Sequence, residues 1–120
     1  MSSPIKAFQA GSMQVQVFPS NRETSQAAAQ AAAAALRDAI ASRGRARIAV
    51  STGNSQLEFI DALVLAPGLD WSAVEAFHLD EYAGVPMTHP ASFRLWLKTR
   101  LAARVPLRAM HYVGVRLVRP

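Results

Sequence analysis

Cysteine is absent from the 120-residue sequence. A disulfide framework, a cysteine-ligated metal site and a thiol nucleophile are therefore excluded. Disulfides concentrate in oxidising compartments, so their exclusion fits a cytoplasmic protein. We accordingly expect a cytoplasmic location.

Long apolar runs are also lacking. The first six residues, Met1–Lys6, contain no apolar segment of the kind that a secretory signal needs. No run approaches the roughly 20 apolar residues of a membrane-spanning helix. The sequence therefore predicts neither a secretory leader nor a membrane partner.

Charge is sparse, at 18% of residues, and the net charge of +5 comes mostly from arginines spread along the chain. Nucleic-acid-binding proteins gather such charge into a stripe, so no nucleic-acid partner is predicted. With 51% hydrophobic residues, the chain can bury the core of one domain and is too short for two.

The N-terminal part predicts a leader, a strand and a long helix. Residues 1–12 are predicted as a polar leader, and apolar and polar residues alternate over 13–18, as in an edge strand. Ser20 and Glu23 have the spacing of a capping box. The alanine-rich run 22–43 contains no glycine or proline, which predicts a helix packed closely against a sheet.

The remainder alternates strands and helices. The predicted strands are 47–51, 74–79 and 110–113, the predicted helices are 56–65 and 91–103 with Pro90 in the first turn, and 70–72 is a turn or short capped helix. Successive strands lie about 30 residues apart, the size of a βαβ unit. This order predicts an α/β fold, a partial doubly wound (Rossmann-like), mostly parallel sheet with flanking helices on its faces.

Two polar segments, Ser51–Gln56 and Asp80–Tyr82, follow predicted strands at the ends where parallel sheets bind ligands. In the first segment, Gly53 permits unusual backbone angles. Free N–H groups at the start of the next helix form an anion site, and phosphate is its natural ligand. The segment lacks the endings of a Walker or dinucleotide loop, and an ordinary N-capped turn is the alternative.

Asp80 and Glu81 are adjacent carboxylates. Neighbouring residues on an extended chain point to opposite sides, so one carboxylate is expected to face a cleft and the other to make a structural contact. A carboxylate in a partly dry cleft can act as a general base, because burial raises its pKa. The alternative is a solvated turn.

The three histidines are far apart and show no ligand spacing, so no metal site is predicted. His78 lies inside a predicted strand, where a hydrogen bond can hold it, and His89 is expected as an N-cap or loop residue. Neither Ser51 nor Ser55 lies in a Gly-x-Ser-x-Gly elbow, which argues against a serine hydrolase.

Together these segments resemble a known enzyme family. Several segments resemble motifs of the glucosamine-6-phosphate deaminase (isomerase) family. They are Ser-Thr-Gly-Asn-Ser-Gln at 51–56, Phe-His-Leu-Asp-Glu-Tyr at 77–82, Gly84-Val85-Pro86, and His89-Pro90-Ala91-Ser92-Phe93. The resemblance covers residues 13–114. The related 6-phosphogluconolactonases usually carry Asp-Glu-Arg at the matching place, so Tyr82 favours the deaminase branch.

The resemblance implies a sugar phosphate as the partner and a role for each segment. The phosphate-binding residues would be Thr52, Gly53, Asn54 and Ser55. Asp80 would be the general base that moves a proton between C2 and C1 of the open-chain sugar, with ammonia released from C2. The supporting residues would be Glu81, Tyr82 and His89. The resemblance implies neither a cofactor nor a metal.

Two departures from the family pattern bear on activity. The loop has Gly-Asn-Ser-Gln where many members have Gly-Ser/Gly-Thr-Pro, and the later Asp-Gly…His segment used for ring opening has no match here. Residues 115–120 look like a truncation. Because the ring-opening segment is missing, we expect weak or no turnover from this chain alone. The alternatives are a 6-phosphogluconolactonase-like hydrolase and a non-catalytic sugar-phosphate-binding remnant.

An incomplete sheet also exposes apolar surface that favours pairing with another chain, as in a homo-oligomer.

Overall fold

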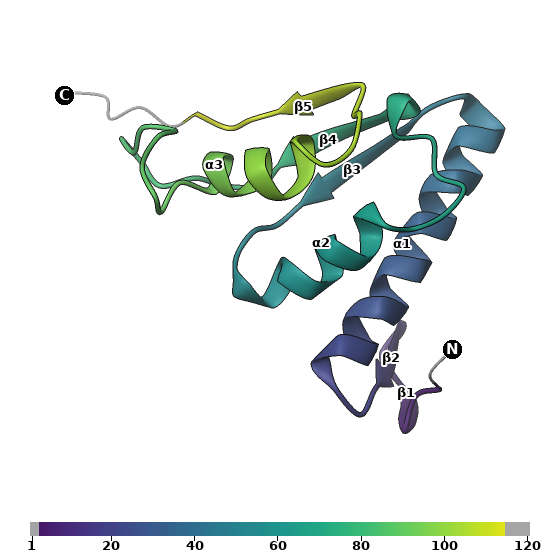
Figure 1. The fold of residues 1–120 in the computed structure, drawn as a ribbon. Helices are drawn as coiled ribbons and strands as arrows, with labels where there is room; N and C mark the ends of the chain where they lie inside the picture. The colour runs from purple at the N-terminus through teal and green to yellow at the C-terminus, as the bar shows by residue number, and fades with distance from the viewer. Residues whose placement is uncertain (1–2, 115–120) are drawn as a thin grey trace.

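The computed structural model describes residues 3–114, so the predicted tail at 115–120 lies outside the described residues. Its centre is a three-stranded parallel sheet in the order β3-β4-β5, formed by Ala46–Val50, Val74–His78 and Ala109–His111 (Figure 1). The α/β fold class and all three of these strands are confirmed, with bounds shifted by one or two residues.

The N-terminal strand does not join this sheet. β2 (Met13–Val17) pairs instead with β1 (Lys6–Ala10) in an antiparallel hairpin that stands apart from the parallel sheet (Figure 1). The predicted polar leader 1–12 was therefore wrong in missing β1. The two strands are joined by Gly11 and Ser12, with Gly11 at φ 62°, which suits the first position of a tight hairpin turn.

The long helix α1 (Asn21–Arg43) forms where its caps predict it. The Ser20 hydroxyl accepts a hydrogen bond from the Glu23 N–H at 3.2 Å, and Gly44 closes the C-terminal end at φ 77°. Ala29 and Ala33 are buried, and the helix packs against α2 and β3. Small side chains on this face allow the close approach.

The two later helices begin slightly later than predicted. A 3-10 turn (Asn54–Gln56) precedes α2 (Leu57–Val64), and a second 3-10 turn (Trp71–Ala73) precedes β4. The last helix, α3 (Phe93–Leu97), continues as a π-helical segment (Lys98–Ala102). Its N-cap is Ser92, so the prediction of Pro90 in the first helical turn was wrong.

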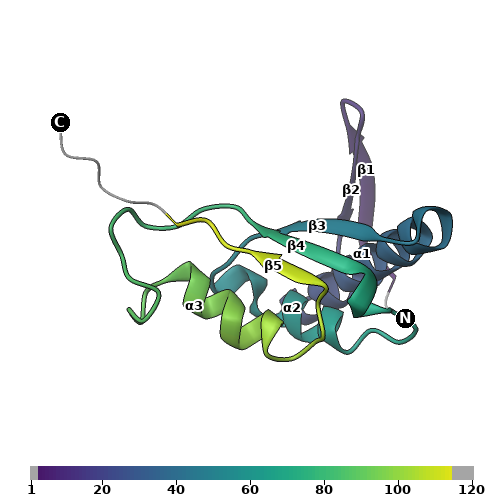
Figure 2. The same cartoon turned by 90° about the horizontal axis from the view of Figure 1, so that it is seen from above.

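All three helices share one core on one face of the sheet. Val50, Val74 and Ala76 are buried there with helical residues such as Leu63 and Leu97, and Figure 2 shows α2 and α3 along the same side of the strands. The opposite face carries exposed side chains at Ala49, Phe77 and His111, which are partners in the register. Helices were predicted on both faces, and within residues 3–114 they cover one.

None of the helices in the described part of the chain is both long and apolar enough to cross a lipid bilayer.

We expect Ala33→Leu to lower the free energy of unfolding by about 1–3 kcal/mol, because the added atoms overfill a close-packed helix contact. Ala33 is 1% exposed. The matched change Ala35→Leu, at an exposed position of the same helix, should cost less than about 0.5 kcal/mol. Urea unfolding followed by circular dichroism measures both, and equal losses would contradict the packing described here.

Candidate functional site

The parallel register places both predicted polar segments at one edge of the sheet. Val50 at the end of β3 pairs with His78 at the end of β4. Thr52 and Asp80 each follow two residues later along neighbouring strands. Because such strands lie about 4.8 Å apart, the two loops leave the sheet side by side.

The loop after β3 is shaped by one glycine. Gly53 has φ 106° and ψ 175°, a conformation that is strained for other residues. A Cβ added there meets nothing within 4 Å, so the backbone angle and not the space requires glycine. The helical hydrogen bonds begin with the Gln56 N–H donating to the Gly53 carbonyl at 3.0 Å. The N–H groups of residues 53–55 therefore precede the helix, where they can bind an anion.

The side chains of this loop differ in exposure. Asn54 and Ser55 are exposed at the start of the helical turn, while Thr52 is half-buried beside the strand end. The Ser55 hydroxyl accepts only a long contact of 3.5 Å from the Gln56 amide. It therefore remains available to a ligand.

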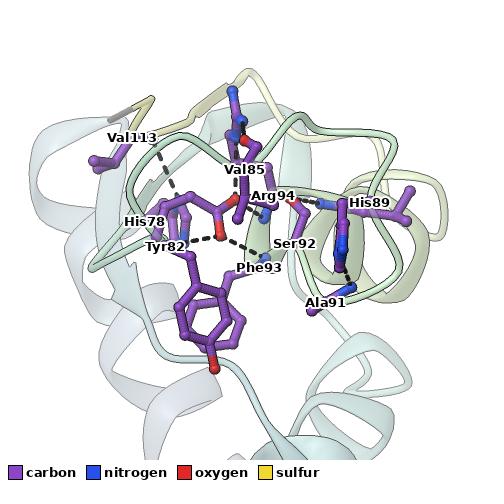
Figure 3. A network of polar contacts seen from close by, with 11 residues as sticks. His78, Tyr82, Val85, His89, Ala91, Ser92, Phe93, Arg94 and Val113 are labelled. Carbon is purple, nitrogen blue, oxygen red and sulfur yellow. Dashed lines mark hydrogen bonds and ion pairs between the residues drawn. The ribbon is translucent and has the colours of Figure 1, made fainter. Parts of the chain in front are cut away.

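The Glu81 carboxylate is the centre of the second segment (Figure 3). Its side chain is 0% exposed. Oε1 accepts hydrogen bonds from the backbone N–H groups of Tyr82 (3.0 Å) and Phe93 (2.9 Å). Oε2 accepts from the Ser92 hydroxyl (2.7 Å), the Arg94 backbone N–H (3.0 Å) and Arg94 Nε (3.1 Å). One carboxylate thus joins the end of β4 to the N-terminus of α3.

These donors hold Glu81 in its charged form. Burial by itself raises the pKa of Glu81, but hydrogen bonds from Ser92, Arg94, Phe93 and Tyr82 outweigh it and lower the pKa to about 2. The negative charge also lies at the N-terminal end of a helix, where the backbone dipoles favour it.

Asp80 behaves differently from its neighbour. Its side chain is exposed, and its carboxylate makes no hydrogen bond or ion pair with any other residue of the described range 3–114. The predicted division is confirmed in that Glu81 makes the structural contact. The expected dry cleft around the other carboxylate is not observed, because Asp80 lies in solvent.

Tyr82 and His89 lie on different sides of the α3 start (Figure 3). The Tyr82 ring lies 4.8 Å from the Phe93 ring between centroids, and the residue is 51% exposed. His89 is a loop residue whose Nδ1 accepts a hydrogen bond from the Ala91 N–H at 3.0 Å. His89 therefore shapes the turn before the helix.

His78 is buried and hydrogen-bonded, as predicted for a strand histidine. Its Nδ1 accepts from the Val113 N–H at 3.3 Å, which ties the end of β4 to the segment after β5. Its Nε2 has no partner among residues 3–114. Burial lowers the pKa of His78, against the opposing charges of Glu81 and Asp80.

Within the described range, no three His, Asp or Glu side chains gather to hold a metal.

Sequence reasoning missed the role of Arg94. The sequence patterns assigned it no function, but its side chain is only 19% exposed and is paired with Glu81. Its Nη2 also donates to the Val85 carbonyl at 2.6 Å. The partners lie nine and thirteen residues away, beyond the reach of a helical pattern.

A separate groove of about 720 Å³ lies between α1 and the end of α2. Its lining is mostly apolar, including Ala34, Ala62 and Leu65. Arg37 lies there too, and its guanidinium donates to the Pro67 carbonyl at 2.8 Å. The groove contains none of the predicted site residues, so the strand ends remain the candidate site.

A comparison of the sequence with protein families identifies the family of this chain. The model described as "Glucosamine-6-phosphate isomerases/6-phosphogluconolactonase" matches residues 19–119. The chain belongs to this family. The match contains both polar segments and every strand of the parallel sheet.

Individual proteins similar to this chain carry the two activities that the family description names. A glucosamine-6-phosphate deaminase from Arthrobacter sp. (strain FB24) is 35% identical over 96 residues, which cover 78% of this chain and 35% of the relative. A 6-phosphogluconolactonase structure from Shewanella baltica OS155 matches with a TM-score of 0.70 at 24% identity, covering 85% of this chain and 42% of that one. A monomeric glucosamine-6-phosphate deaminase matches with a TM-score of 0.68 at 21% identity, covering 79% and 40%. The chain thus spans well under half the length of these relatives.

We expect Glu81→Gln to lower the free energy of unfolding at pH 7 by about 2–4 kcal/mol, because the amide cannot accept all of the donors around it. The matched change Glu75→Gln removes partly exposed pairs with Arg108 and His111, and should cost less than about 1 kcal/mol. Urea unfolding of the three proteins measures both. Equal losses would show that the carboxylate is not an anchor.

The effect of Glu81→Gln should also depend on pH. The folded pKa of about 2 lies below the ordinary value of 4.5. The charged carboxylate therefore stabilises the fold above the unfolded pKa, and this contribution is lost as the pH falls toward the folded pKa. The difference in unfolding free energy between wild type and Glu81→Gln should become smaller from pH 6 to pH 3. A difference that stays constant over this range would contradict a charged, hydrogen-bonded Glu81 in the folded state.

Proposed function

We propose that the carboxyl-terminal edge of β3 and β4 binds a sugar phosphate and that its chemistry is that of a glucosamine-6-phosphate deaminase. The observation that carries the proposal is the pairing of Val50 with His78. It brings the loop after β3, which we propose binds the phosphate, beside an exposed carboxylate that has no partner within residues 3–114. Family membership and the deaminase relative at 35% identity support the same substrate class.

In this proposal, the phosphate lies on the loop after β3. The backbone N–H groups of Gly53, Asn54 and Ser55 and the Ser55 hydroxyl supply its hydrogen bonds, with Thr52 beside them. This arrangement suits the Gly53 backbone angles, which turn the chain into the helix start. Binding through backbone donors also explains how a loop without Lys or Arg can hold an anion.

Asp80 is the proposed general base. It removes the proton from C2 of the open-chain amino sugar and returns it to C1, through an enol-type intermediate. The C1 oxygen gains a proton as the enol forms, and protonation of C1 then leaves a C=N bond at C2. Water adds to this carbon, ammonia leaves, and the ketose phosphate remains. Asp80 suits this role because its carboxylate has no hydrogen-bond or ion-pair partner among residues 3–114, while that of Glu81 is fully engaged. Glu81, Tyr82 and His89 support the loop around it.

A 6-phosphogluconolactonase-like hydrolase is the second candidate, because the matching family includes both activities. Tyr82 stands where lactonases usually carry arginine, and it packs on Phe93 with its ring half-exposed. This position lacks the positive charge that the lactonase pattern supplies. The deaminase therefore remains the first candidate, with a non-catalytic sugar-phosphate-binding protein as the third.

Binding tests the phosphate loop directly. We expect Gly53→Ala to weaken binding of glucosamine 6-phosphate by about tenfold or more in calorimetry, since a strain of about 1–3 kcal/mol must be met for the loop to keep its shape. Gly68→Ala is the matched control, because Gly68 also has a positive φ (69°) but lies in the turn after α2. Equal affinities for the wild type and Gly53→Ala would reject the loop as the phosphate site.

Turnover tests the base. The 120-residue chain should release ammonia from glucosamine 6-phosphate slowly, because these residues contain no Asp-Gly…His segment for ring opening. Asp80→Asn should abolish any ammonia release while leaving sugar-phosphate binding within about twofold. Hydrolysis of 6-phosphogluconolactone, with no ammonia released from glucosamine 6-phosphate, would favour the lactonase instead. Binding without either reaction would favour the non-catalytic candidate.

A further inference from the structure

In the loop between β4 and α3, residues 82–92, the two end residues contact Glu81, while the interior, 83–91, is tied to the rest of the described chain by a single side chain. Its interior closes on itself, with the Val85 N–H donating to the Tyr82 carbonyl (3.4 Å) and the His89 N–H to the Pro86 carbonyl (2.9 Å). Within the described chain, one hydrogen bond joins the interior of this loop, 83–91, to a residue beyond the loop. It runs from Arg94 Nη2 to the Val85 carbonyl, at 2.6 Å.

Arg94 binds a second acceptor with the same guanidinium. Its Nε donates to Glu81 Oε2 at 3.1 Å, and its backbone N–H donates to the same oxygen at 3.0 Å. Because the guanidinium is planar and its donors are fixed in a fork, these bonds set the position of Val85 relative to Glu81. The group is mostly buried, with a side chain that is 19% exposed.

One end of this bridge, the Glu81 carboxylate, belongs to the residue directly after the proposed base. Asp80 lies between the last residue pairs of β4 and the anchored Glu81, and Tyr82 follows directly. Asp80 has no tether of its own within residues 3–114. Its place at the edge of the sheet therefore depends on its neighbours, and on the loop that continues from them.

We propose that Arg94 is a positioning residue, which holds the 82–92 loop against the end of β4 and so fixes Asp80 and Tyr82 at the sugar end of the site. The inference rests on the proposed function and deepens it. The phosphate loop 51–55 follows a different strand, and no hydrogen bond joins it to Arg94 in the described part of the chain. Loss of Arg94 should therefore affect recognition of the sugar and spare recognition of the phosphate.

The test uses the full 120-residue chain with Arg94→Lys. Lysine keeps the charge and the helix, but its single ammonium cannot reproduce the fork between Glu81 and Val85. Arg100→Lys, at an exposed position of the following helical segment, is the matched control. Hydrogen exchange by NMR should show the Val85 and His89 amides exchanging about tenfold faster or more in Arg94→Lys, with the β4 amides unchanged.

Calorimetry with two ligands measures the consequence for the site. Arg94→Lys should weaken binding of glucosamine 6-phosphate by about fivefold or more, because the displaced 82–92 loop loses its contacts with the sugar. Binding of inorganic phosphate should change by less than about twofold, because inorganic phosphate contacts only the 51–55 loop. Equal weakening of both ligands would overturn the positioning role in favour of general damage to the fold. Unchanged loop exchange would overturn it as well.

The two proposals fail in distinguishable ways. If the wild-type chain binds neither compound, the proposed function fails, and the exchange of the Val85 and His89 amides still decides whether Arg94 holds the loop. If the wild type binds both compounds and Arg94→Lys leaves exchange and affinity unchanged, the proposed function stands and the positioning role is rejected.

Discussion

The buried Glu81 carboxylate is the interaction on which the candidate site depends. It accepts five hydrogen bonds from four residues, drawn from the loop after β4 and from the N-cap and first turn of α3. A strand end, a helix start and the loop between them are thereby held by one charged group. Such a group is stable in the interior only while its donors surround it, so the loop and the helix start must be ordered together.

This anchor gives two adjacent carboxylates different tasks. Alternation along an extended chain predicted that Asp80 and Glu81 point apart, and the structure bears this out. Alternation could not say which one turns inward, because both have the same chemistry. The choice is made by donors at the start of α3, twelve and thirteen residues along the chain. Glu81 is thereby committed to structure, and Asp80 remains available to a ligand.

The features predicted correctly are those encoded locally. Ser20 and Glu23 cap α1 within one turn, and the spacing of short apolar runs locates the three parallel strands. The features missed depend on distant partners. β1 is a strand only through its pairing with β2, and the contacts of Arg94 are set by a loop that brings Val85 and Glu81 back to it. Local sequence patterns therefore could not reveal the contacts of that side chain.

The open face of the sheet bears on the exposure of the site. Parallel sheets are normally covered on both faces, yet the described helices cover one. Phe77 is 37% exposed on the other face and Leu79 is 57% exposed just beyond the strand. Asp80 follows directly and is in solvent as well. A general base works best where water is limited, so the proposed chemistry requires a cover over this edge that residues 3–114 do not supply. The uncovered sheet face thus accounts for the exposed apolar side chains, and the solvent around Asp80 adds to the missing ring-opening segment as a reason to expect weak turnover.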